Sequence, residues 1–175
     1  MLTHGNLQLD CQDGTLTVFK EVLKLVSPTV LGGALEALGN SGSGEGGSKL
    51  PALKVDGTVG QWKLVLFYIY PVLDCGVPSR EDLHSILPIA HKYDMTNLLA
   101  FIHTQLVRTL YGKMTLQPGT STYVFKWLVT AEQLQLDDLR DECLDALGTY
   151  LLPEFHKHID ANMAALGKLS PTTMA

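Results

Sequence analysis

The 175-residue chain is poor in charge and has no long apolar run. Only 18% of its residues are charged against 46% that are apolar, a balance typical of a folded chain with one sizeable core rather than of a disordered one. The longest uncharged apolar run, residues 64–73, has ten residues, about half of the roughly 20 that a membrane-spanning helix needs. We therefore expect one folded domain with at most a short appendage, and not a membrane protein.

Cysteine is scarce, and positive charge is not clustered. The three cysteines, Cys11, Cys75 and Cys143, lie far apart, which argues against a disulfide framework. The first ten residues hold neither a basic cluster nor an apolar stretch, so we expect no secretory signal and a cytoplasmic or nuclear protein. The 13 Lys and Arg residues are scattered and the net charge is −5, which argues against nucleic acid as a partner.

Alternating polarity predicts a β-hairpin near the start of the chain. Apolar and polar residues alternate over residues 7–11, and Asp13-Gly14 is a strong turn signal before a second strand over residues 15–19. Residues 52–55 predict a third strand, which Pro51 restricts to an edge or to a strand start. Before that strand, residues 39–49 are rich in glycine and serine and predict a flexible loop.

Helical spacing of apolar residues dominates elsewhere. The first such set is Val18, Val22, Leu25 and Val26. Ser27-Pro28 then predicts the start of a second short helix over residues 29–38, because serine is a favoured N-cap and proline fits the first helical position. Longer helices are expected over residues 59–70, 81–93 and 96–111, the middle one kinked or shortened by Pro88.

A second copy of the last helix pair follows 41 residues later. Four apolar positions, Leu87, Ala90, Leu98 and Leu106, match Leu128, Ala131, Leu139 and Leu147, and the turn residues Tyr93 and Met95 match Leu134 and Leu136. Stacked helical hairpins extend a core rather than build a reaction centre. The sequence thus predicts an α+β fold with a small three-stranded sheet packed on a cluster of helical hairpins, followed by an extra helix pair.

Three features of the sequence are candidate functional sites. Residues 42–47 fit the G-x-G-x-x-G pattern of dinucleotide binding, but a helix rather than a strand precedes them. His156 and His158 lie near Cys143 and could hold zinc, although no further ligand pair accompanies them, which favours a solvated helix end. The hypothesis of a metal-dependent or nucleotide-binding enzyme depends on these two features alone. We therefore assign no catalytic residue, no metal ligand and no cofactor.

An acidic helix face is the third feature. It consists of Asp138, Asp141, Glu142 and Asp145, with Arg140 as the nearest cation. Such a face is usually the solvated side of an amphipathic helix. The alternative is an acidic docking surface for a basic partner.

Several segments resemble one family of interaction domains. Residues 19–28, Phe-Lys-Glu-Val-Leu-Lys-Leu-Val-Ser-Pro, resemble the His-Lys-x-Val-Leu-x-x-x-Ser-Pro signature of BTB/POZ domains, with Phe19 in the place of the histidine. Residues 62–70 and 87–93 are similar to the helices that follow it in that family, in the same order. The resemblance implies a BTB/POZ-like domain over residues 1–112. The repeat resembles a 3-box or the start of a BACK region, which gives a helical extension over residues 120–165.

The resemblance implies a non-enzymatic protein–protein interaction module. It implies self-association as a homodimer and, as an adaptor, recruitment of a cullin scaffold of a ubiquitin ligase. The positions that match the cullin-facing surface are Leu64 and Tyr70, with Tyr93 and Met95 in the adjacent turn, and core packing is the other explanation for each of them. The glycine-rich loop replaces the family's cullin-contact loop, so the alternative is a scaffold or transcriptional co-regulator without a ubiquitin-ligase role.

Overall fold

The computed structural model describes residues 5–40, 50–70, 79–110 and 112–169. The chain divides into two compact units, an N-terminal unit of residues 1–102 and a C-terminal unit of residues 103–175. The division falls inside helix α5 (Thr96–Leu110). A three-stranded mixed sheet accompanied by helices confirms the predicted α+β class. The predicted limits of the two domains, 1–112 and 120–165, stay a prediction.

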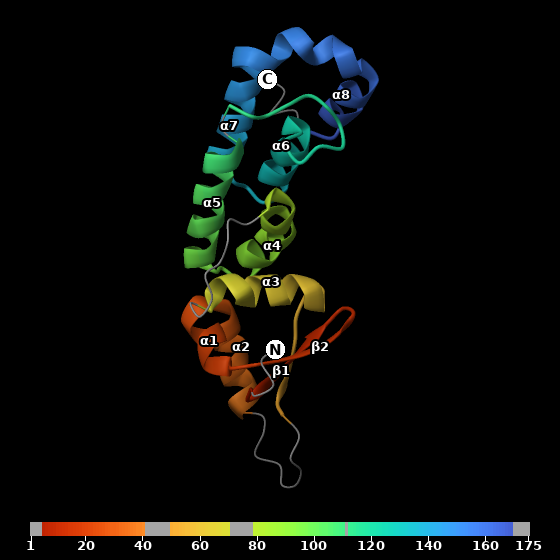
Figure 1. Cartoon of the computed structure of the whole chain (residues 1–175). Coiled ribbons are helices and arrows are strands. Elements are labelled where there is room, and N and C mark those ends of the chain that lie inside the picture. The colour runs from red at the N-terminus through yellow and green to blue at the C-terminus, as the bar shows by residue number, and fades with distance from the viewer. Residues whose placement is uncertain (1–4, 41–49, 71–78, 111, 170–175) are drawn as a thin grey trace. The chain divides into compact units, whose positions relative to one another are not determined.

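The sheet of the N-terminal unit is built on the predicted hairpin. Strands β1 (Leu7–Cys11) and β2 (Gly14–Val18) pair antiparallel, and β3 (Ala52–Lys54) pairs parallel with β1 in the order β2-β1-β3 (Figure 1). The third strand therefore lies at an edge, as Pro51 predicts. Leu7 and Leu9 are buried because the alternation of side chains along β1 places both on one face of the sheet.

Two short helices, α1 (Lys20–Val26) and α2 (Val30–Asn40), follow the hairpin and pack together. Helix α2 extends two residues beyond the predicted limit, and residues 41–49 of the predicted loop lie outside the described residues. The apolar face predicted for α1 is wrong at Leu25, which is 80% exposed, whereas Leu23 is fully buried. Two residues along a helix are about 200° apart, so burial of Leu23 places Leu25 in solvent.

Helices α3 (Val59–Ile69) and α4 (Arg80–Lys92) both begin with side-chain caps. Thr58 and Gln61 form a capping box on α3, and the Ser79 hydroxyl accepts a hydrogen bond from the Asp82 amide at the start of α4. The predicted shortening of α4 at Pro88 does not occur, since the helix continues to Lys92. The Gln61 side chain donates a 2.8 Å hydrogen bond to the Ser85 carbonyl, which stabilises the turn before the proline.

The predicted repeat is confirmed at the level of the backbone. Asp94 in the α4–α5 turn has a φ of 49°, and Gln135, 41 residues later, has a φ of 54°. The Met95 amide donates to the Ala90 carbonyl at 2.9 Å, and the matching Leu136 amide donates to the Ala131 carbonyl at 2.8 Å. Each copy of the repeat thus ends one helix with a left-handed residue and starts the next helix two residues later.

The second copy comprises α6 (Val124–Gln133) and α7 (Asp137–Ala146) of the C-terminal unit. A π-helical turn η1 (Leu147–Leu151), a 3₁₀ helix η2 (Leu152–His158) and helix α8 (Ile159–Leu166) follow. Trp127 and Phe125 are the largest side chains buried in this unit. The indole nitrogen of Trp127 donates to the Ser121 carbonyl at 2.8 Å, so the ring carries no unpaired donor into the core.

Among residues 5–40, 50–70, 79–110 and 112–169, no helix has both the length and the apolar character needed to cross a bilayer.

Candidate interaction surfaces

Exposed apolar side chains cluster in sequence around α1. Leu25 is 80% exposed, and Phe19 and Val30, at the starts of α1 and α2, are 37% and 41% exposed. The sequence analysis placed Leu25 on the apolar face of this helix. The position of Leu23 could have corrected that prediction, because two leucines two residues apart cannot lie on one side of a seven-residue helix. Burying three such side chains against another protein is favourable, since apolar area removed from water lowers the free energy of association.

Tyr70 and Leu64 lie on or next to α3, and both are partly exposed. Tyr70 is the C-cap residue of α3, and its amide donates to the Leu66 carbonyl. Burial raises the pKa of the Tyr70 hydroxyl above its usual value, and the neighbouring backbone of Phe19 offsets part of the rise. The buried Tyr70 hydroxyl therefore lies near the backbone of Phe19, at the start of the α1 segment.

Tyr93 is a core residue whose hydroxyl forms a hydrogen bond with the backbone. It is 7% exposed, and its hydroxyl accepts a 2.7 Å hydrogen bond from the Asp56 amide. Its ring packs at 5.4 Å against that of Trp62, whose indole nitrogen donates to the Asp56 carbonyl at 2.8 Å. Lys92 forms an ion pair with the Asp56 carboxylate. The structure thus places Tyr93 beneath the surface, where it holds the end of β3 against α4.

Met95 is fully buried, and the Ser27-Pro28 segment lies at the same turn. The Ser27 hydroxyl donates to the Tyr93 carbonyl and accepts from the Leu31 amide at 3.1 Å. The Thr29 hydroxyl donates to the Asp94 carboxylate at 3.0 Å. Ser27 is itself fully buried, so this serine connects the α1–α2 junction to the α4–α5 turn.

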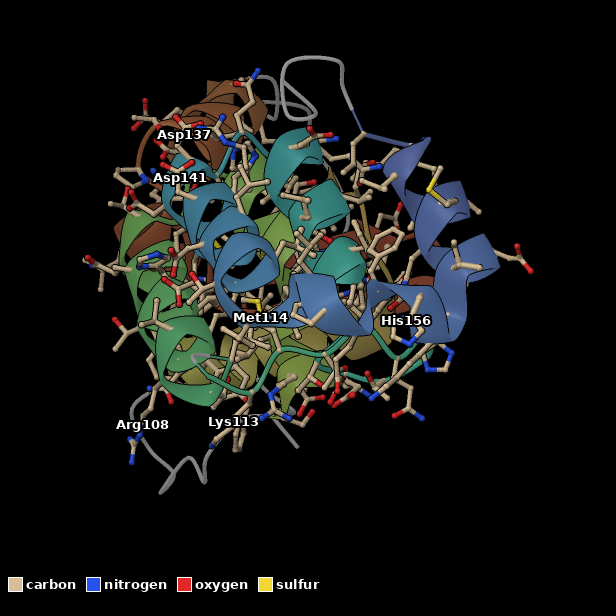
Figure 2. All side chains as sticks on the ribbon, turned by 90° about the horizontal axis from the view of Figure 1, so that it is seen from above. Arg108, Lys113, Met114, Asp137, Asp141 and His156 are labelled. Carbon is tan, nitrogen blue, oxygen red and sulfur yellow. The ribbon has the colours of Figure 1, made fainter. Side chains whose placement is uncertain are left out.

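The acidic face of α7 is partly neutralised. Arg140 pairs with Asp137 at 2.8 Å and with Asp141 at 3.0 Å, and Figure 2 shows both carboxylates together on this helix. Asp145 accepts from the Thr149 hydroxyl at 3.2 Å. Because exposed ion pairs are screened by water and salt, this face is typical of a solvated helix surface.

The possible zinc ligands do not form a site. Cys143 is fully buried in α7, whereas His156 and His158 are exposed on η2, and Figure 2 shows His156 pointing away from the rest of the C-terminal unit. Within the described part of the chain, no group of three or more His, Cys, Asp or Glu residues is arranged to hold a metal ion. The glycine-rich candidate at residues 42–47 lies outside the described residues.

Comparison with known proteins adds no family assignment. No protein-family model matches the chain, and no curated protein matches it.

Proposed function

We propose that the chain is a BTB/POZ-like protein interaction module that works by association with other proteins and not by catalysis. The observation that carries the proposal is the α1 segment, where Leu25, within the motif of residues 19–28, is 80% exposed. The same motif contains the buried Ser27, whose two hydrogen bonds give its Ser-Pro element a structural role. Both observations agree with a domain that keeps its fold rigid and presents apolar side chains outward.

Self-association is the first activity of the proposed module. A standard interface buries roughly 800 Å² on each partner, and a few apolar or aromatic anchors contribute most of the free energy. Leu25, Phe19 and Val30 supply such anchors on one segment. We propose that a second copy of the chain covers them.

Size-exclusion chromatography with light scattering tests this step on the full chain. At tens of micromolar we expect a dimer, which Leu25→Lys converts to a monomer because a charge cannot be buried there without a partner. Leu152→Lys is the matched control, since Leu152 is also an exposed leucine, 65% exposed, but belongs to the C-terminal unit. A monomeric parent chain, or a dimer that Leu152→Lys disrupts and Leu25→Lys does not, contradicts the proposed interface.

Recruitment of a cullin is the second proposed activity and uses Leu64 and Tyr70. Both residues are partly exposed, although the Tyr70 hydroxyl itself is buried, so a partner can reach part of each residue. Tyr93 and Met95 support the turn from inside. A pull-down with the cullin N-terminal domain should capture the parent chain, and Tyr70→Ala should weaken the capture. Tyr150→Ala is the control, because Tyr150 is also partly exposed but lies in the C-terminal unit.

The experiments test self-association and cullin binding independently of each other. A chain that dimerises but does not bind the cullin loses the adaptor role and keeps the scaffold or co-regulator role as the better description. A chain that does neither contradicts the proposed function as a whole.

A further inference from the structure

The two edges of the sheet differ in how they are protected against further strands. Pro51 precedes the edge strand β3, and Lys54 ends it. Proline and lysine on an edge are two of the devices that keep another strand from pairing there. The other edge strand, β2, contains neither proline nor charge, and two threonines and a valine make it rich in β-branched residues. An added strand is therefore expected at β2 and not at β3.

The backbone groups that face outward from β2 belong to Thr15 and Thr17. In β1, the Gln8 amide and the Asp10 carbonyl each form a 2.9 Å hydrogen bond with the chain that flanks β3. Their antiparallel partners on β2 are Thr17 and Thr15. Since residues paired in this way direct their N–H and C=O groups away from each other, those of the two threonines point away from β1. Within the described part of the chain, no strand lies on that side of β2.

The side chains of β2 suit pairing of this strand with a second copy of itself. Leu16 lies opposite the buried Leu9, on the core face of the sheet, and is only half-buried. Thr15 and Thr17 lie on the other face, where Thr15 is exposed. In an antiparallel pair centred on Leu16, each Thr15 faces a Thr17 and the two leucines face each other. Threonine pairs across strands are favourable, no like charges meet, and the leucines lose apolar area to water.

We propose that two copies of the chain pair antiparallel through β2, which joins their sheets into one continuous sheet. Thr15 and Thr17 of each copy exchange backbone hydrogen bonds with Thr17 and Thr15 of the other. The inference rests on the self-association proposed above and names its contact. Strand β2 ends at Val18, directly before the exposed Phe19, so this edge continues into the α1 segment assigned to a second copy. Because the same surface is used on both copies, the pairing closes at a dimer.

Hydrogen exchange on the full chain tests the pairing at the atoms that make it. At tens of micromolar, where the chain is dimeric, the Thr15 and Thr17 amides donate to the second copy. We expect both amides to exchange about tenfold more slowly there than after dilution below the dissociation constant. The Leu16 amide is the internal control, because it points toward β1 within one copy and its exchange should respond much less to dilution.

Charged substitutions test the register of the pair. Thr15→Lys/Thr17→Lys puts a lysine opposite a lysine at both positions, and light scattering should show a monomer. Thr15→Glu/Thr17→Lys puts a glutamate opposite a lysine at both positions and should restore the dimer. A mixture of Thr15→Lys/Thr17→Lys with Thr15→Glu/Thr17→Glu should form a heterodimer, which also shows that both variants are folded.

The outcomes separate this pairing from the proposed function. A dimer that Thr15→Lys/Thr17→Lys leaves intact and Leu25→Lys disrupts overturns the β2 pairing and supports the α1 interface. A dimer that the double lysine variant disrupts and Leu25→Lys does not supports the pairing and contradicts the α1 interface. Slow exchange at Thr15 and Thr17 that persists in the monomer overturns the pairing, because the same chain then covers this edge. A monomeric parent chain contradicts both.

Discussion

The backbone amide of Asp56 donates a 2.7 Å hydrogen bond to the hydroxyl of Tyr93, 37 residues further along the chain. The Asp56 carbonyl in turn accepts from the Trp62 indole at 2.8 Å. Two aromatic side chains thus satisfy both backbone polar groups of one residue between β3 and α3. Because an unpaired buried polar group costs free energy, Tyr93 contributes to stability through its hydroxyl as well as through its ring.

Tyr93→Phe removes the hydroxyl and keeps the ring. The Asp56 amide then loses its acceptor, and we expect the free energy of unfolding to fall by about 1–2 kcal/mol. Urea unfolding followed by tryptophan fluorescence measures it, since Trp62 packs against the Tyr93 ring. Tyr150→Phe, at a residue 39% exposed, should change stability by less than about 0.5 kcal/mol. Equal effects of the two substitutions would show that the Asp56 hydrogen bond contributes nothing.

Gln135→Gly tests the left-handed turn of the C-terminal unit. Gln135 has a φ of 54°, a conformation that glycine adopts without the steric cost that other residues bear. We expect the substitution to be neutral or to stabilise the chain by up to about 1 kcal/mol. Gln133→Gly, two residues earlier and at the last residue of α6, should destabilise it by up to about 1 kcal/mol. The same order of effects in thermal unfolding would support the assigned turn, and the reverse order contradicts it.

Thr58→Ala tests the capping box at the start of α3. The Thr58 hydroxyl accepts from the Gln61 amide at 3.2 Å, and the Gln61 side chain accepts from the Thr58 amide at 2.9 Å. Alanine leaves the Gln61 amide without its side-chain acceptor, so we expect a loss of about 1 kcal/mol in the free energy of unfolding. Thr58→Ser keeps an acceptor at the same position and should retain most of the stability. A loss as large for serine as for alanine would mean that the methyl group, and not the cap, is responsible.

Local signals in the sequence were enough to predict much of the fold. The alternation through Leu7 and Leu9 predicted β1, Asp13-Gly14 predicted the hairpin turn, and the offset of 41 predicted the paired turns at Asp94 and Gln135. Each of these depends on residues close together in the chain or on a pattern repeated at a constant distance. Such signals do not require knowledge of what packs against the element.

The errors arose where packing partners decide the outcome. Leu25 fits a helical stripe as well as Leu23 does, and only the tertiary structure determines that Leu23 is the buried one. Pro88 was expected to kink or shorten α4, but the helix continues past it to Lys92, and the Gln61 side chain of α3 hydrogen-bonds the Ser85 carbonyl in the same stretch. The pocket lined by Gln135, Arg140 and Leu169 was not predicted for a similar reason, because three elements, η1, η2 and α8, separate α7 from Leu169 in the sequence.

The Cys143 thiol makes stability depend on pH in the alkaline range. Burial raises its pKa to about 12 from an ordinary value of 9.0, and Glu142 adds to the rise. Between these two pH values the unfolded chain has released this proton and the folded chain has kept it, so stability falls as pH rises, by up to about 1.4 kcal/mol per pH unit. Below pH 9 the contribution of the thiol is fully present.

Urea unfolding of the parent chain and of Cys143→Ala between pH 8 and 10.5 measures this contribution. Burial also raises the pKa of Tyr123 and Tyr150 in the same unit, so both chains should lose stability at high pH. The difference between them isolates the thiol, because alanine has no proton to release. We expect the stability advantage of the parent chain over the variant to be constant up to pH 8.5 and to shrink above it. Parallel curves over the whole range would mean that the folded thiol ionises as readily as the unfolded one.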